Sequence, residues 1–122
     1  MNKLLTNLEL KVMNLLWKLD RAHVKEIVEV WPEAEKPAYN TISTTVRILQ
    51  EKEFIGHEAQ GRTHLYFPLI SKRSYQLMHI KSVLENVFAG SATSLVSALV
   101  DQEKLSEKEI DDIRDMIAKG DH

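Results

Sequence analysis

The sequence contains no cysteine, and this absence excludes disulfide bonds and metal sites built on thiolates. It also lacks a long apolar run, so neither a signal peptide nor a membrane insertion is predicted, and we expect a cytoplasmic protein. Glycine-rich phosphate loops, nucleophile motifs and carboxylate pairs in a predicted cleft are missing, which indicates a protein that is not an enzyme and needs no cofactor. The 122 residues, 43% of them hydrophobic, are enough for one domain with an appendage.

An excess of positive charge is missing as well. The chain has 16 Lys and Arg against 18 Asp and Glu, whereas nucleic-acid-binding domains usually carry a basic patch. Residues 1–70 hold nine basic and nine acidic side chains, and residues 71–122 hold seven and nine. Affinity for DNA grows with the number of phosphates neutralised, so a monomer with this balance should bind weakly. If the protein binds DNA, the charge balance favours a dimer.

Residues 39–53 have the periodicity of a helix with two different faces. Apolar side chains recur at helical spacing along one face: Tyr39, Ile42, Val46 and Leu49. The other face carries short hydroxyls, one amide and one guanidinium: Asn40, Thr41, Ser43, Thr44 and Arg47. Base edges and phosphates accept hydrogen bonds from such groups at close range, so this face is a candidate DNA-reading surface. An ordinary solvated face is the alternative.

The segment that follows predicts a β-hairpin. Two short runs rich in apolar and aromatic residues flank Gln60-Gly61, which we interpret as a two-residue loop with Arg62 at the tip. A polar-faced helix followed by a hairpin is the order of a winged helix-turn-helix. Arg62 and His64 are therefore further candidates for DNA contact, with a plain polar turn residue as the alternative for Arg62.

The same register would place His57 and His64 opposite each other across the hairpin. Two imidazoles could begin a metal site, but structural zinc needs four ligands and catalytic zinc needs three. The sequence fixes no third ligand nearby. We therefore favour histidines that face phosphate, and we predict no metal site.

Two helices precede the polar-faced one. The first begins at Thr6, where Glu9 completes a capping box, and its apolar stripe is Leu8, Val12, Leu15, Leu16 and Leu19. The second spans Val24–Trp31 and is followed by a loop over Pro32–Pro37, because Pro32 disfavours helix at the residue before it. Three short helices and then a hairpin complete the winged-helix order.

After the hairpin the sequence predicts three more helices and no strand. The first covers residues 71–88, a short and very apolar helix follows, and a capping box of Ser106 and Glu109 opens the last. These helices have apolar faces that need a cover. The predicted fold is thus mostly α with a small β-hairpin wing: a winged helix-turn-helix DNA-binding domain over residues 1–70 and a helical dimerisation domain over residues 71–122. The expected dimer contacts are Leu77, Leu84, Leu95, Leu99, Ile110, Ile113 and Ile117.

Along nearly its whole length the chain resembles the penicillinase-repressor family of BlaI/MecI/CopY-type transcriptional regulators. The matching segments are LELKVMNLLW, VKEIVEV, YNTISTTVRILQEK, the hairpin pattern Gly61-Arg62…Tyr66…Pro68, and SLVSALVDQEKLSEKEIDDI. The resemblance implies a homodimeric repressor whose partners are double-stranded operator DNA of palindromic sequence and a second copy of itself. The chain departs from the family at Glu53, where a glycine commonly closes the helix. A winged-helix adaptor that binds proteins and no DNA is the alternative function.

The resemblance also implies a switch. In the β-lactam branch of the family, a metallopeptidase linked to a membrane sensor triggers cleavage in the C-terminal region, at the position occupied here by Ala98 and Leu99. That branch commonly carries Asn-Phe at the bond, so two ordinary helix-core residues are the alternative. The copper branch binds metal through a cysteine cluster, and the absence of cysteine excludes a switch of that kind here.

Overall fold

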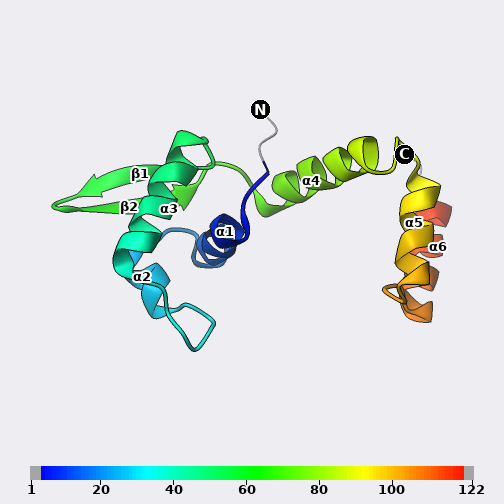
Figure 1. Cartoon of the computed structure of the whole chain (residues 1–122), viewed down its shortest axis with the longest axis horizontal. Coiled ribbons are helices and arrows are strands. Elements are labelled where there is room, and N and C mark those ends of the chain that lie inside the picture. Colours follow the sequence, from blue (N-terminus) through cyan, green and yellow to red (C-terminus); the bar gives the residue numbers. More distant parts are fainter. Residues whose placement is uncertain (1–3, 120–122) are drawn as a thin grey trace. The chain divides into compact units, whose positions relative to one another are not determined.

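The computed structural model describes residues 4–119, which form six helices and one two-stranded sheet (Figure 1). In chain order the elements are α1 (Asn7–Leu19), α2 (Val24–Glu29), α3 (Tyr39–Glu51), β1 (Ile55–Gln60), β2 (Thr63–Pro68), α4 (Lys72–Asn86), α5 (Ala92–Asp101) and α6 (Glu107–Lys119). The predicted fold class, mostly α with a hairpin wing, is confirmed. Contacts divide the chain into two compact units between His79 and Ile80, within α4. None of the described helices is both long enough and apolar enough to cross a membrane.

Both predicted capping boxes are present. At the start of α1 the Glu9 amide donates to the Thr6 hydroxyl over 3.2 Å, and the Thr6 amide donates to the Glu9 carboxylate over 2.9 Å. Ser106 and Glu109 exchange the equivalent bonds at the start of α6, over 3.2 and 3.1 Å. These bonds satisfy amides that a helix start leaves without partners, which is why the sequence signals located these two ends well.

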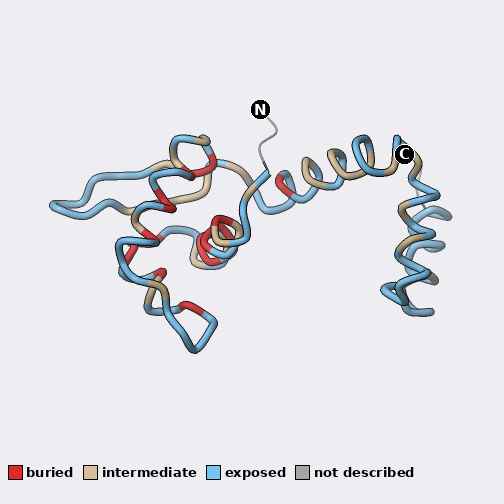
Figure 2. The backbone as a smooth tube through the Cα atoms, in the orientation of Figure 1, coloured by how far each residue is buried: buried red, intermediate tan, exposed pale blue. Residues whose placement is uncertain are grey.

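The core of the first unit lies between α1, α2, α3 and the hairpin, where Figure 2 shows most of the buried backbone. The fully buried side chains come from the predicted stripes and their neighbours: Val12, Met13, Leu16, Ile27, Ile42, Val46, Leu49 and Ile55. Trp31 is buried although α2 already ends at Glu29, two residues earlier than predicted. The restriction that Pro32 places on its predecessor explains the early end.

The hairpin differs from the predicted register. Gln60 pairs with Thr63, so the two loop residues are Gly61-Arg62 and not Gln60-Gly61. Gly61 has a φ of 61°, the positive value that two-residue hairpin turns require at their first position. The prediction that His57 and His64 pair directly is therefore wrong. In the observed register His57 lies opposite Tyr66, two positions beyond the predicted partner His64. A shift of two residues keeps the His57 and His64 rings on the same face of the hairpin, where they stack diagonally with their centroids 4.2 Å apart.

The end of α3 is closed by a turn in which Glu53 has a φ of 68°. The Glu53 amide donates to the Gln50 carbonyl over 3.0 Å, and the Phe54 amide donates to the Leu49 carbonyl over 3.0 Å. These two bonds are those of a Schellman motif, with Glu53 at the left-handed position that glycine favours. The helix therefore stops at Glu51, two residues before the predicted end, and Glu53 occupies the site at which the family commonly has glycine.

A buried ion pair joins the start of α1 to the end of α3. The Lys52 ammonium lies 2.8 and 3.0 Å from the two Glu9 carboxylate oxygens, and the two side chains are 23% and 7% exposed. Burial pushes the pKa of the Glu9 carboxyl upward, but hydrogen bonds from Lys52 and Thr6 outweigh it and leave that pKa below the ordinary value. The carboxylate is thus held charged inside the fold.

Two further contacts connect the hairpin to the helices. Ala22, between α1 and α2, exchanges backbone hydrogen bonds of 2.9 Å with Tyr66 of β2, so it adds a short bridge to the sheet. The Trp17 indole of α1 donates to the Ile70 carbonyl over 2.9 Å, just beyond β2. The C-terminal half of β2 is therefore fixed to the helical core, which sets where the wing stands relative to α3.

The first turns of α4 belong to the core of the first unit. Tyr75 is buried, its ring centroid lies 6.1 Å from that of Trp17 and 5.9 Å from that of Phe54, and its hydroxyl accepts the Leu5 amide over 3.0 Å. In the second unit, α5 and α6 contain no buried residue among those described. Its helices therefore keep their apolar side chains open in the single chain.

Candidate nucleic-acid interface

The polar face of α3 is open to solvent as predicted. Asn40, Thr41, Thr44 and Arg47 are exposed and Ser43 is half-buried, whereas the stripe on the other side is fully buried except for its first member. Within the helix, the Arg47 guanidinium donates to the Thr44 hydroxyl over 3.4 Å. The face thus presents short donors and one long cation on a helix that the core holds in place.

Tyr39 was assigned to the apolar stripe, and this assignment is wrong. Its side chain is 54% exposed and lines the polar side of the unit. The spacing to Ile42 and Val46 is that of the stripe, but α3 begins at Tyr39, and the core does not extend to its first turn. The phenol therefore joins the candidate interface.

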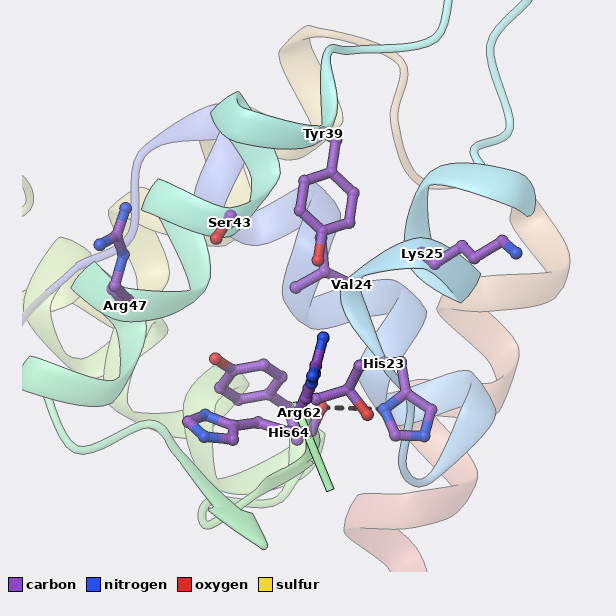
Figure 3. A pocket seen from close by; sticks show the side chains of 10 residues that line it. His23, Val24, Lys25, Tyr39, Ser43, Arg47, Arg62 and His64 are labelled. Atoms are coloured by element: carbon purple, nitrogen blue, oxygen red, sulfur yellow. Dashed lines mark hydrogen bonds between the residues drawn. The ribbon is translucent and has the colours of Figure 1, made fainter. Parts of the chain in front are cut away.

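A cleft opens between α2, α3 and the tip of the wing (Figure 3), and we refer to it as the α3–wing cleft. Its lining contains three permanent cations, Lys25, Arg47 and Arg62, together with two histidines, His23 and His64. Hydroxyls come from Tyr39, Ser43, Thr63 and Tyr66, and Val24 is the one aliphatic member of the lining. No carboxylate is among these described residues. The sequence predictions Ser43, Arg47, Arg62 and His64 are thus brought together, while Asn40, Thr41 and Thr44 lie outside the cleft.

The cleft cations have no acidic partner in the described part of the chain. The ion pairs found there use Lys11, Lys52, Lys108 and Arg114. Figure 3 shows the Arg62 side chain and the Tyr39 hydroxyl directed toward each other across the opening, with Lys25 pointing away from its centre. Uncompensated cations beside hydroxyl donors form a surface that attracts anions.

His23 fixes one wall of this cleft. Its Nδ1 lies 3.0 Å from the His64 carbonyl oxygen, and because a carbonyl can only accept, Nδ1 carries the proton and donates. The backbone amide of His23 donates in turn to the Glu26 carboxylate over 2.8 Å at the start of α2. One residue thereby ties β2 to the helix-turn-helix.

Tyr66 closes the floor of the cleft. It is buried, and its ring centroid lies 6.0 Å from those of both His57 and His64. Burial raises the pKa of the Tyr66 phenol, nearby Tyr39 adds to the rise and Arg47 opposes it. The phenol therefore stays protonated and available as a donor at neutral pH. Within residues 4–119, no three His, Cys, Asp or Glu side chains gather as a metal site would require.

Six residues that line the cleft were missing from the predicted interface: His23, Val24, Lys25, Tyr39, Thr63 and Tyr66. His23 and Lys25 flank the start of α2, which the sequence assigns to the core only through Val24 and Ile27. Their nearness to the wing depends on the bridge between Ala22 and Tyr66, a long-range pairing with no local signal. Lys25 is the one cation in α2, and that was the only available hint.

The residues predicted for dimerisation lie on α4, α5 and α6. Leu77, Leu99, Ile113 and Ile117 are exposed in the single chain, and Leu84, Leu95 and Ile110 are half-buried. The candidate cleavage residues, Ala98 and Leu99, lie within α5, the first half-buried and the second exposed.

Comparisons with known proteins agree with this arrangement. Residues 5–119 match the family described as penicillinase repressor. The chain is 27% identical over 115 residues to the methicillin resistance regulatory protein MecI of Staphylococcus aureus strain N315, covering 94% of each chain. It is 26% identical over 109 residues to the penicillinase repressor of Bacillus licheniformis, covering 89% of this chain and 85% of the relative. The solved DNA-binding domain of the repressor BlaI matches with a TM-score of 0.52 at 27% identity, over 58% of this chain and 87% of that domain. With its polar-faced α3, its wing and a match that spans both units, the chain belongs to the penicillinase repressor family.

Proposed function

We propose that this protein, a DNA-binding transcriptional repressor, acts as a homodimer on a palindromic operator and reads it with the polar face of α3 and the wing. The observation that carries the proposal is the set of unpaired donors on one side of the first unit. Arg47 on α3 and Arg62 on the wing tip open into the same cleft, and no carboxylate lines it. The phosphates of a DNA duplex would supply the negative charge that the described residues do not place beside these cations.

In this arrangement the α3 face enters the major groove. Arg47 projects from the middle of the helix and reaches a guanine edge or a phosphate, while Thr41 and Thr44 offer methyl and hydroxyl groups. Asn40 and Ser43 complete the donor surface. Arg62 in the hairpin loop and His64 on β2 meet the backbone or the minor groove beside the α3 site, as wings do.

Replacing Arg47 by alanine tests the assignment. A bidentate guanine contact is worth about 1–3 kcal/mol, so Arg47→Ala should weaken operator binding roughly 5- to 150-fold. Folding should hardly change, because the side chain lies off the buried stripe. Arg21→Ala is the matched control, since Arg21 stacks on the Phe67 ring 5.7 Å away and does not line the cleft.

The measurement is a salt titration of fluorescence anisotropy with the chain's own upstream promoter. Equal affinities for Arg47→Ala and the wild type would remove Arg47 from the interface. Absence of any salt-sensitive duplex binding by the wild type would instead support a protein-binding adaptor.

The homodimer is supported by the open apolar side chains of the helical region. Val96, Ile113 and Ile117 line one groove between α5 and α6, and Leu99 is exposed on α5 as well. Exposed apolar patches of this kind usually mark contact sites. Sedimentation at micromolar concentration should show a dimer. Leu99→Asn should dissociate it, because a buried amide without partners costs a few kcal/mol, whereas Lys108→Asn on the solvated side of α6 should not. A wild-type monomer would overturn this part of the proposal.

Proteolytic release is the switch that we propose, with a metallopeptidase linked to a membrane sensor as the partner. The bond between Ala98 and Leu99 is helical, so a protease must first open α5. In a single chain this opening costs little, because no described residue of α5 is buried there. A cut there would remove α6 and weaken the dimer, and each half-site alone neutralises too few phosphates. Mass spectrometry of protein from induced cells decides the matter: an intact 14.0 kDa chain during full derepression would exclude cleavage.

A further inference from the structure

The α3–wing cleft has a chemistry that base reading does not require. Phosphate oxygens are negatively charged and only accept hydrogen bonds, whereas base edges present donors as well as acceptors. The cleft contains permanent cations and hydroxyl donors, and no carboxylate lines it. The neighbouring groove on the far side of Arg47 differs, because Glu51 and Gln50 line it together with His57.

This concentration of charge is local. Residues 1–70 carry equal numbers of acidic and basic side chains, yet three of their nine cations line this one cleft. The acids of the same unit that form ion pairs are directed elsewhere, Glu9 to Lys52 and Glu33 to Lys11. The cleft is therefore a positive site within a stretch, residues 1–70, whose acidic and basic side chains balance, and it has room for a compact anion.

The walls are also fixed before any ligand arrives. His23 donates to the His64 carbonyl, Ala22 and Tyr66 exchange backbone hydrogen bonds, and Gly61 sets the turn that carries Arg62. Figure 3 shows the Tyr39 hydroxyl and the Arg62 guanidinium facing each other over the opening. The backbone that carries both donors is thus held in place before binding, which favours affinity.

We propose that the α3–wing cleft seats one phosphodiester group of the operator backbone, clamped between the Arg62 guanidinium and the Tyr39 hydroxyl. The proposal rests on the proposed function, because it takes α3 as the reading helix. A guanidinium presents parallel N–H donors that match two phosphate oxygens, and a phenol donates one more bond. Lys25 and Arg47, at the sides, add charge without closing the opening. Each subunit of a dimer would seat one such phosphate.

The site of this phosphate can be located with operators that carry a single methylphosphonate, which removes the charge of one phosphodiester. Wild-type protein should lose roughly tenfold or more in affinity at one backbone position of each half-site, the loss expected for a charged hydrogen bond. Arg62→Gln should lose as much on the unmodified operator and should then be insensitive to the methylphosphonate at that position. The slope of its log affinity against log salt concentration should decrease by the amount expected for one phosphate contact fewer per half-site.

Tyr39→Phe should show the same positional insensitivity with a smaller loss, about threefold, because it removes one neutral donor. Arg21→Gln is the matched control and should keep the full methylphosphonate response. Both cleft side chains are exposed, so thermal unfolding of the variants should match the wild type.

A free phosphate ion is the other source of this chemistry. Titration with sodium phosphate against sodium chloride at equal ionic strength tests this source. Phosphate inhibition that Arg62→Gln abolishes, without any backbone position at which Arg62→Gln loses its methylphosphonate response, would assign the cleft to the free ion and overturn the backbone assignment.

Two results would contradict the proposal in different ways. If wild-type protein binds the operator but Arg62→Gln responds to every methylphosphonate as the wild type does, the cleft holds no backbone phosphate and the proposed function stands. If the wild type shows no salt-sensitive operator binding, the proposed function itself fails.

Discussion

Replacing Lys52 by methionine would remove the cation from the buried pair that joins the start of α1 to the end of α3. Methionine has a similar length and no charge, so the substitution removes the ammonium and keeps most of the packing. It leaves the Glu9 carboxylate, 7% exposed, with its capping bond to the Thr6 amide as its remaining contact. The energetic consequence is therefore that of an unpaired buried charge.

The magnitude follows from burial. Removing one partner of a buried ion pair typically costs about 3–5 kcal/mol. Lys52 is 23% exposed and Glu9 keeps its backbone donor, so we expect about 3 kcal/mol, at the low end of that range. Adding Glu9→Gln to Lys52→Met should recover most of the loss, because glutamine is neutral and still completes a capping box.

The pH dependence provides a second signature. The folded-state pKa of Glu9 is lowered, so the carboxylate contributes stability above its unfolded value of about 4.5 and loses that contribution as pH falls through the folded pKa. In Lys52→Met the largest lowering cause disappears while burial, which raises the pKa, remains. Stability between pH 4 and 7 should then rise less with pH than in the wild type, or fall.

Urea unfolding followed by tryptophan fluorescence is a suitable assay, because Trp17 and Trp31 both lie in the first unit. The matched control is Lys11→Met: its pair with Glu33 has a similar distance, 3.1 Å, but the side chains are 46% and 54% exposed. Such surface pairs contribute about 0–1 kcal/mol. Equal losses for Lys52→Met and Lys11→Met would refute the reasoning that burial sets the cost.

Three further substitutions test other features. Glu53→Gly should raise the free energy of unfolding by up to about 1 kcal/mol, because it relieves a left-handed residue at the end of α3; urea unfolding would detect it, and a loss would contradict the strain. Gly56→Ala should lower Tm, since an added Cβ would lie 3.0 Å from the Phe67 ring, and an unchanged Tm would show that the ring moves freely. His23→Ala should speed amide hydrogen exchange in β2 and weaken operator binding by a fewfold, as it removes the bond to His64; unchanged exchange would mean that the bridge at Ala22 holds the wing alone.

Local signals predicted most of the fold. The capping pairs Thr6–Glu9 and Ser106–Glu109 located two helix starts, because the residues that form each box lie three positions apart in sequence. The hairpin register failed by contrast. Gln60-Gly61 and Gly61-Arg62 both place a glycine in the loop, and the choice depends on which residue adopts the positive φ at the first loop position. Because the two registers differ by two, the side chains still face the predicted way.

The site was predicted only where one element carries it. The polar face of α3 followed from helical spacing, but the cleft needs α2, α3 and β2 together. Lys25 and His23 reach it through a pairing between Ala22 and Tyr66, which are 44 positions apart in sequence. Helical spacing assigned Tyr39 to the apolar stripe, but the buried part of that stripe begins one turn later, at Ile42. Periodicity specifies the direction of a side chain and gives no information on how far the core extends.

Tyr75 determines where the chain could be divided without damaging the core of the first unit. It lies five residues beyond the predicted end of the DNA-binding domain, yet its ring packs with Trp17 and Phe54 and its hydroxyl holds the Leu5 amide. A fragment ending at residue 70 would leave an aromatic-sized void in the DNA-reading unit, whereas one ending after His79 would keep the ring. A cut within α5 lies beyond His79 and therefore leaves the packing around Tyr75 intact. Proteolysis there would disable assembly and release a reading unit that is still folded, so a repressor silenced in this way would persist as an intact competitor of low affinity for its own operator.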